Sequence, residues 1–312
     1  IGSEPRYEAA LLDARIRKSW LENNINIARI GGGDKASYNI NELGDDVKII
    51  EQIFKGKHSY NKILEKSDKT LFLIGESVIN REDGRGILGR IRDIAKKYNS
   101  YSDKWNGIGV LHTSANRVGA LEAGFVPGEG GLNTSEIIEG TKNKKIKLLW
   151  LLGYDEEIIK KESSAFIIYQ GHHGDFGAES ADLILPGSAY TEKNGTYINT
   201  EGRVQRTYAA VPPPGNAKED WKIIRAFSEY IDKTLPYNNI SQLRSYFENI
   251  NKNFVIENSL LKSETSDIGD TKVKLNNVSI KPLKMNYFMT CPISRSSETM
   301  AKCSIAKSKL GM

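Results

Sequence analysis

The chain has few of the residues from which redox centres and membrane spans are built. Cys291 and Cys303 are its only cysteines, and they do not form a Cys-x-x-Cys pair. A disulfide framework, or an iron–sulphur cluster held by about four thiolates, needs more thiols, so we expect a reducing compartment and no cluster in these residues. The best apolar run, residues 148–152, has the length of a strand, whereas a spanning helix needs roughly 18 residues. The sequence therefore predicts no direct membrane span.

Catalytic signatures are also missing. There is no Gly-x-Ser-x-Gly elbow and no Gly-x-x-x-x-Gly-Lys-[Ser/Thr] loop, which argues against a hydrolase and a P-loop nucleotide site. Neither cysteine lies at a predicted strand end beside a histidine. The neighbouring side chains of His172 and His173 tend to point apart, and no spacing around them suits zinc. The sequence thus predicts no catalytic residue and no metal ligand.

The charge is modest and mixed in sign. Lysine and arginine number 44 against 39 acidic residues, a net charge of +5. Lysines stand among acidic residues, as at 160–162, which indicates a solvated surface and no nucleic-acid partner. Because 39% of the 312 residues are hydrophobic, we expect a globular protein, and its length favours two domains.

Apolar runs and helical periodicities alternate along the chain. Continuous apolar runs that end near glycine or proline predict buried strands at residues 70–74, 148–152, 165–169 and 182–186. Apolar residues at helical spacing predict helices at residues 7–21, 87–95 and 110–123. This alternation predicts an α/β protein with doubly wound parallel sheets.

The expected organisation has three parts. Residues 1–67 form a partial α/β domain in which Ile1 and Gly2 end a parallel strand that lies upstream of this chain. Residues 68–235 form a second α/β domain. Residues 236–312 form a loosely structured C-terminal extension, because Asn, Ser and Lys dominate there.

The pattern changes after residue 186. Turn signals predict a small antiparallel excursion over residues 194–206. Asn216, with Glu219 three residues later, resembles a capping box for the helix that follows. A further helix is expected at 241–249, and irregular chain after residue 259 forms the C-terminal tail.

One glycine-rich segment fits a dinucleotide pattern. Residues 31–36, Gly-Gly-Gly-Asp-Lys-Ala, follow a short strand predicted at residues 26–30 and match G-x-G-x-x-G/A. In such a site the third small residue opens a helix whose N-terminus meets the pyrophosphate. Residues 37–41 are a poor helix start, which favours an exposed turn. The hypothesis that the protein is an NAD-dependent dehydrogenase is supported by this pattern alone.

Longer runs carry a specific resemblance. They are FIIYQGHHGD at 166–175, ADLILPG at 181–187, EKNGTYINTEGRVQ at 192–205 and ISRSSETMAKC at 293–303. These runs resemble the large iron–sulphur subunit of respiratory complex I, the proton-pumping NADH–quinone oxidoreductase. The second and third are shared with molybdopterin oxidoreductases such as formate dehydrogenases and indicate the fold only. The first and last point to the complex I subunit.

The resemblance implies a molybdopterin-oxidoreductase type of fold and a structural role. In that family the iron–sulphur clusters lie in an N-terminal region that this chain does not contain. The remaining part is a scaffold that typically holds no molybdenum, so no cofactor is expected here. The implied partners are the flavin-containing subunit pair and the other iron–sulphur subunits of the hydrophilic arm. The implied location is the matrix side of the mitochondrial inner membrane, or the cytoplasmic side of a bacterial plasma membrane.

The alternative is the cofactor-binding half of an active molybdopterin oxidoreductase. In such enzymes, loops equivalent to residues 2–6 and 171–175 face the pterin nucleotide. The resemblance therefore implies a vestigial ligand pocket at Ser3, Glu4, Arg6, Gly171, His172 and Asp175.

Overall fold

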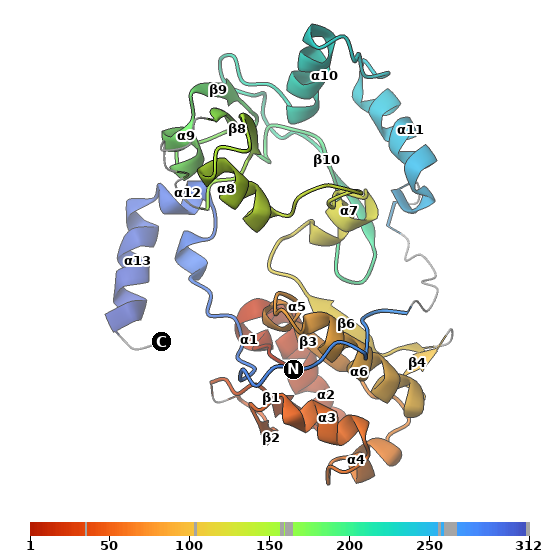
Figure 1. Cartoon of the computed structure of the whole chain (residues 1–312). Helices are drawn as coiled ribbons and strands as arrows, with labels where there is room; N and C mark the ends of the chain where they lie inside the picture. Colours follow the sequence, from red (N-terminus) through yellow and green to blue (C-terminus); the bar gives the residue numbers. More distant parts are fainter. Residues whose placement is uncertain are drawn as a thin grey trace. The chain divides into compact units, whose positions relative to one another are not determined.

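Figure 1 shows a computed structural model of the chain, which describes residues 1–34, 36–102, 105–156, 159, 165–254, 257–258 and 267–309. Lys35 and the charged residues 160–162 of the sequence analysis lie outside these ranges. The chain divides into two compact units. Unit 1 comprises residues 1–117 and 261–285, and unit 2 comprises residues 118–260 and 286–312. Each unit contains parallel strands together with helices, which confirms the predicted α/β class.

Unit 1 is built on short strand pairs. Two of them are parallel, β1 (Ala28–Ile30) with β2 (Asn41–Gly44), and β3 (Phe72–Gly75) with β6 (Ile108–Leu111). The third is antiparallel, β4 (Tyr101–Ser102) with β5 (Trp105–Asn106). Its helices are α1 (Pro5–Glu8), α2 (Ala10–Asn23), α3 (Lys48–Phe54), α4 (Asn61–Glu65), α5 (Glu76–Ile79) and α6 (Gly84–Lys97).

The first two residues lie between the two parallel pairs. The Ile1 amino group donates to the carbonyl oxygen of Leu73 at 2.7 Å, and the Ile1 carbonyl accepts from the Gly75 N–H at 2.9 Å. On the other side, the Gly2 N–H donates to the Ile30 carbonyl at 2.8 Å. These are the bonds of a parallel strand, so Ile1 and Gly2 occupy a strand position between β1 and β3.

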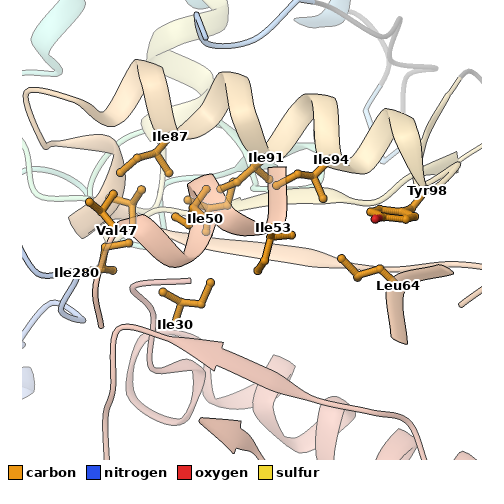
Figure 2. Close-up of a cluster of buried hydrophobic side chains, with 12 residues drawn as sticks. Ile30, Val47, Ile50, Ile53, Leu64, Ile87, Ile91, Ile94, Tyr98 and Ile280 are labelled. Carbon is orange, nitrogen blue, oxygen red and sulfur yellow. The ribbon is translucent and has the colours of Figure 1, made fainter. Parts of the chain in front are cut away.

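One hydrophobic cluster contains residues from both sequence segments of unit 1, residues 1–117 and 261–285. α6 contributes Ile87, Ile91 and Ile94, which share one face because they are three and four residues apart, and α3 contributes Ile50 and Ile53 (Figure 2). Residues Ile30, Val47, Leu64, Ile74, Val78, Tyr98 and Ile280 complete the cluster. The helical periodicity predicted for residues 87–95 is confirmed by α6.

A segment from the far end of the sequence completes this core. Ile280 is 1% exposed within the cluster, and its N–H donates to the Asp45 carbonyl at 2.7 Å. The segment also runs tightly along α6, since a Cβ at Gly89 would lie 2.8 Å from the backbone of Asp270. Glycine is required there for this close approach.

The prediction of one helix over residues 110–123 is wrong in its first half. Residues 108–111 form β6, and only α7 (Arg117–Glu122) is helical. The register pairs Ile108 with Phe72 and Val110 with Ile74, and β-branched and aromatic side chains of this kind suit a sheet. His112, expected on a helix, follows the end of β6 instead. The polar segment 39–67 also contains β2 and α4, which the sequence analysis did not predict.

Unit 2 contains a three-stranded parallel sheet in the order β7 (Leu148–Leu152), β8 (Phe166–Gly171), β9 (Leu183–Pro186). All three strands match predicted runs. Leu149, Leu151, Ile159, Ile167 and Tyr169 form the core on one face. β9 was expected to be buried, yet its Leu183 and Ile184 are 42% and 52% exposed.

The rest of unit 2 is largely helical. The predicted antiparallel excursion is confirmed by β10 (Gly195–Ile198) and β11 (Val204–Thr207). Besides α7, the helices in the described part of unit 2 are α8 (Thr134–Lys142), α9 (Phe176–Ser180), α10 (Asp220–Tyr230), α11 (Ile240–Ile250), the 3₁₀ turns η1 (Lys252–Phe254) and η2 (Tyr287–Met289), α12 (Pro292–Arg295) and α13 (Glu298–Lys309). The predicted capping box at Asn216 is wrong, because the residue at the N-cap of α10 is Glu219 and no side chain caps it.

The C-terminal tail is irregular over part of its length. Residues 267–285 contain no helix or strand, whereas α12 and α13 follow after residue 291. The predicted division into residues 1–67, 68–235 and 236–312 stays a prediction, and the compact units change between residues 117 and 118. None of the helices in the described residues combines the length and apolar character needed to cross a membrane.

Truncating Ile91 tests the shared core of unit 1. The side chain is 1% exposed, so Ile91→Ala leaves a cavity and should lower the free energy of unfolding by about 2–5 kcal/mol. Urea denaturation followed by circular dichroism measures this loss. Leu11→Ala is the matched control, because Leu11 is 85% exposed and its truncation should change stability little. Equal effects of the two variants would contradict the assignment of this core.

Candidate functional site

Ser3 and Glu4 lie where the first strand position meets α1. The backbone turns at Gly2, which has a φ of +56°, and Ser3 is 4% exposed. Glu4 is the N-cap residue of α1 and makes no side-chain cap bond. Instead the carboxylate of Glu8 reaches back, accepting from the Ser3 hydroxyl at 3.2 Å and from the Glu4 N–H at 2.6 Å. Burial raises the pKa of Glu8.

The side chains of Glu4 and Arg29 bind the glycine-rich turn that follows β1. The Glu4 carboxylate accepts from the Asp34 N–H, and the Arg29 guanidinium donates to the carbonyls of Gly33 and Asp34 at 3.2 and 3.1 Å. Arg6 is exposed, with its guanidinium 6.0 Å from the centre of the Tyr7 ring. No helix begins in the described part of residues 31–41, so the geometry that a dinucleotide site requires is not present there.

A buried carboxylate joins the carboxyl ends of β3 and β6. Glu76 is 6% exposed and accepts from the Thr113 N–H at 2.8 Å, from the Thr113 hydroxyl, and from the Arg117 guanidinium at 2.9 Å. These bonds outweigh the effect of burial and lower the pKa of Glu76. Burial also lowers the pKa of the neighbouring His112. Sequence patterns did not predict this cluster, because they place His112 on a helix and not after a strand.

In unit 2 the predicted residues lie at the carboxyl end of β8. Gly171 ends the strand, and a Cβ there would lie 2.2 Å from the Tyr169 hydroxyl, so only glycine fits. The Nδ1 atoms of His172 and His173 are 2.7 Å apart, with their rings edge to face. Burial, followed by the positive fields of His173 and Lys193, lowers the pKa of His172. The prediction that these two side chains point apart is therefore wrong.

Asp175 is held by an arginine from the C-terminal segment. Arg295 on α12 donates its Nε–H to Asp175 at 2.6 Å, and its Nη2 lies 3.0 Å from an Asp155 carboxylate oxygen and 3.3 Å from the Asp155 carbonyl. The side chains of Asp155 and Asp175 are only 9% and 14% exposed. The second oxygen of Asp175 accepts from the Phe176 N–H at the start of α9. Both oxygens of the Asp175 carboxylate therefore have a partner within the chain.

Three buried polar atoms near this edge have no hydrogen-bond partner in the described structure. They are the Gln170 side-chain carbonyl, the Ser188 hydroxyl and the Oδ2 atom of Asp155. The Gln170 amide donates to Asp220 at 3.0 Å, and Asp220 also pairs with Lys193. Buried polar groups normally find partners, so these three atoms are the strongest local indication of a polar ligand or an ordered water.

The six predicted pocket residues fall into two sets. Ser3, Glu4 and Arg6 belong to unit 1, whereas Gly171, His172 and Asp175 belong to unit 2. Within unit 1, Ser3 and Glu4 share Glu8 as a partner while Arg6 points to Tyr7. The described residues contain no group of three or more His, Cys, Asp or Glu side chains that suits a metal ion.

Comparison with known proteins identifies the protein family to which the chain belongs. Residues 1–230 match the family model of molybdopterin oxidoreductases, so the chain belongs to the molybdopterin oxidoreductase family. Residues 255–303 match a second model, which describes the C-terminal part of the G subunit of NADH-ubiquinone oxidoreductase.

Three individual proteins are similar to the chain over nearly its whole length. The chain is 43% identical over 308 residues to the NADH-ubiquinone oxidoreductase 75 kDa subunit of Reclinomonas americana, covering 97% of the chain and 44% of the relative. It is 43% identical over 315 residues to the mitochondrial 78 kDa subunit of the same enzyme from Candida albicans, covering 97% and 42%. It is 40% identical over 307 residues to the G subunit of NADH-quinone oxidoreductase from Rickettsia conorii, covering 98% and 44%. The chain thus spans less than half the length of these relatives.

The Glu76 cluster predicts a pH-dependent contribution to stability. Glu76→Gln should lower the free energy of unfolding of unit 1 by about 1–3 kcal/mol at pH 7, because it weakens bonds to a buried carboxylate. The folded-state pKa of Glu76 is depressed, so its contribution is complete above the usual glutamate pKa of about 4.3. The contribution is lost as the pH falls through the depressed value, and the difference between the two proteins should shrink accordingly.

Urea titrations between about pH 3 and about pH 7 measure this difference. Glu65→Gln is the control, since Glu65 is an exposed carboxylate in the same unit. A Glu76→Gln variant as stable as the Glu65→Gln variant at neutral pH would refute the cluster's contribution.

Arg295 is predicted to hold the C-terminal helices on unit 2. Arg295→Met removes charge-assisted bonds to two largely buried carboxylates, and amide exchange in α12 should accelerate about 10- to 100-fold. Hydrogen exchange with mass spectrometry measures the rates. Lys302→Met is the matched control, because the Lys302–Glu298 pair is 72% and 83% exposed. Unchanged exchange in the Arg295 variant would show that other contacts hold the segment.

Proposed function

We propose that the chain is a structural, non-catalytic part of a respiratory NADH–quinone oxidoreductase, complex I. The relatives are named as subunits of NADH-ubiquinone or NADH-quinone oxidoreductase, and the similarity covers nearly the whole chain. Complex I is an enzyme, but this stretch supports electron transfer from NADH to quinone without performing a chemical step itself.

The observation that carries this proposal is the Arg295 contact. Arg295 lies in residues 255–303, the part that matches the NADH-ubiquinone oxidoreductase model and not the molybdopterin oxidoreductase model. Its guanidinium binds Asp175 and Asp155 at the carboxyl edge of the unit 2 sheet. Parallel sheets of α/β proteins bind ligands at that edge. The Asp175 carboxylate therefore binds Arg295 of the C-terminal segment. In a ligand site, such a carboxylate would remain available to bind the ligand.

The rest of the proposal follows the family resemblance. The iron–sulphur clusters would lie in the part of the relatives that this chain does not match. The partners would be the flavin-containing subunit pair and the other iron–sulphur subunits of the hydrophilic arm. The location would be the matrix side of the mitochondrial inner membrane, or the cytoplasmic side of a bacterial plasma membrane.

One observation favours the second candidate, the cofactor-binding half of an active molybdopterin oxidoreductase. The Gln170 carbonyl and the Ser188 hydroxyl are buried without hydrogen-bond partners in the described structure, near the carboxyl end of β8. A ligand with N–H and O–H groups, such as a pterin nucleotide, would satisfy them. Gly171 and His172 would then lie beside the ligand, as the vestigial pocket requires.

A native gel separates the two candidates. Gently solubilised membranes of the source organism are stained for NADH dehydrogenase activity, probed for this chain, and the band is analysed for metals. Comigration with the activity, with iron present and no molybdenum, supports the complex I scaffold. A smaller band that carries molybdenum without NADH dehydrogenase activity would refute it and support the molybdopterin enzyme. A known complex I subunit probed on the same gel is the control.

A further inference from the structure

One short loop of unit 2 carries most of the net charge of the chain. Residues 142–147, Lys-Asn-Lys-Lys-Ile-Lys, begin at the last residue of α8 and lead into β7 (α8 is labelled in Figure 1). This segment, here called the lysine loop, contains four lysines and no acidic residue. The net charge of the whole chain is +5, so four of the five excess positive charges lie in the lysine loop.

The four ammonium groups have no carboxylate partner among the described residues. All four lysines are exposed, and the ion pairs within the described part of unit 2 join other side chains. The carboxylate nearest in sequence, Glu139, accepts from the Asn143 side chain at 3.5 Å instead. Four like charges in six residues repel one another, so a partner of opposite charge would stabilise them.

One of these lysines occupies a backbone conformation that glycine normally takes. Lys144 has a φ of +60°. Its N–H donates to the Thr141 carbonyl at 3.2 Å, and the Lys145 N–H donates to the Gly140 carbonyl at 2.9 Å. These are the two bonds of a Schellman motif at the end of α8, in which the left-handed residue is usually glycine. A lysine at this strained position favours a role for its charge outside the fold.

The lysine loop is anchored from within unit 2. Ile146, its one apolar residue, packs against the hydrophobic core that contains Leu149 and Leu151. A Cβ at Gly140 would lie 3.1 Å from the Ile146 Cδ1 atom, so the end of α8 and the loop are in close contact. Together with the Schellman bonds, this contact fixes the backbone on which the lysines stand. A partner therefore meets a preformed array of charges, and binding does not have to order the backbone.

We propose that the lysine loop is a docking surface for a carboxylate-rich segment of a partner protein. Charge complementarity of this kind gives specificity and speeds association. Peripheral membrane binding is strengthened by apolar side chains that insert into the bilayer, whereas Ile146 is turned into the core. The loop also has no arginine and no aromatic residue, the side chains that bind nucleic acids most characteristically. The proposal depends on unit 2 alone and not on the proposed function.

The test uses the 312-residue chain and the peptide fluorescein-Glu-Glu-Asp-Glu-Asp-Glu-amide, with binding measured by fluorescence anisotropy at low salt. A peptide with Gln and Asn in place of Glu and Asp is the control ligand. A variant with Lys144→Gly, Lys145→Gln and Lys147→Gln should bind the acidic peptide about 10- to 100-fold more weakly, because each exposed ion pair contributes about 2- to 5-fold. Added salt should weaken binding to the unsubstituted chain, since it screens exposed charges.

Two control proteins separate docking from charge and from folding. Lys218→Gln, Lys233→Gln and Lys252→Gln together remove the same charge from exposed lysines elsewhere in unit 2, and this variant should bind as the unsubstituted chain does. Lys144→Gly alone should not lower the thermal midpoint of unfolding, because glycine suits the φ of +60°. A loss of binding in this variant would then reflect the missing charge and not unfolding.

The outcomes are distinct. Binding of the acidic peptide that is lost only with the lysine loop supports the proposal. Equal losses in the two triple variants would overturn it, because the attraction would then come from net charge alone. Absence of binding to the acidic peptide at low salt would also overturn it. Vesicles containing phosphatidylglycerol, tested in parallel, would in that case show whether the same lysines bind an anionic membrane.

Discussion

A carboxylate buried at the end of a parallel strand needs donors from elsewhere in the chain, and both units depend on this constraint. In unit 1, Glu76 at the end of β3 takes its donors from Thr113 and Arg117, which follow β6. In unit 2, Asp175 beyond β8 takes Arg295 from α12. An unpaired buried charge is costly, so each carboxylate fixes the place of a later segment. At the edges where other α/β proteins bind ligands, these two carboxylates make contacts within the chain.

The sequence predicted the parts of the fold that depend on burial patterns. The continuous runs at β7 and β8 and the isoleucine spacing of α6 were readable because apolar periodicity is local information. β6 was missed, since Val110 and Leu111 also suit a helix and stand at the start of the helix predicted at residues 110–123. The capping box at Asn216 failed because a favourable cap pattern does not fix where a helix begins. In such cases tertiary pairing outweighs local preference.

The candidate site was less predictable than the fold. The position of Gly171, His172 and Asp175 at a strand end followed from β8, whereas the partner of Asp175 lies 120 positions later in sequence. No local pattern encodes such a pair. The same holds for Glu76, whose donors became visible only when β6 was placed beside β3. The family resemblance supplied what spacing could not, namely the complex I relationship that the relatives support.

The return of residues 267–285 to unit 1 has a consequence for biosynthesis. Ile280 lies in the same core as Ile30 and Ile74, and the backbone near Asp270 lies against Gly89. A growing polypeptide emerges from the ribosome in order, so this core stays open until the whole of residues 118–260 has been translated. Contacts of such long sequence separation form slowly. Nascent unit 1 would therefore expose apolar surface for the period in which chaperones act on unfinished chains.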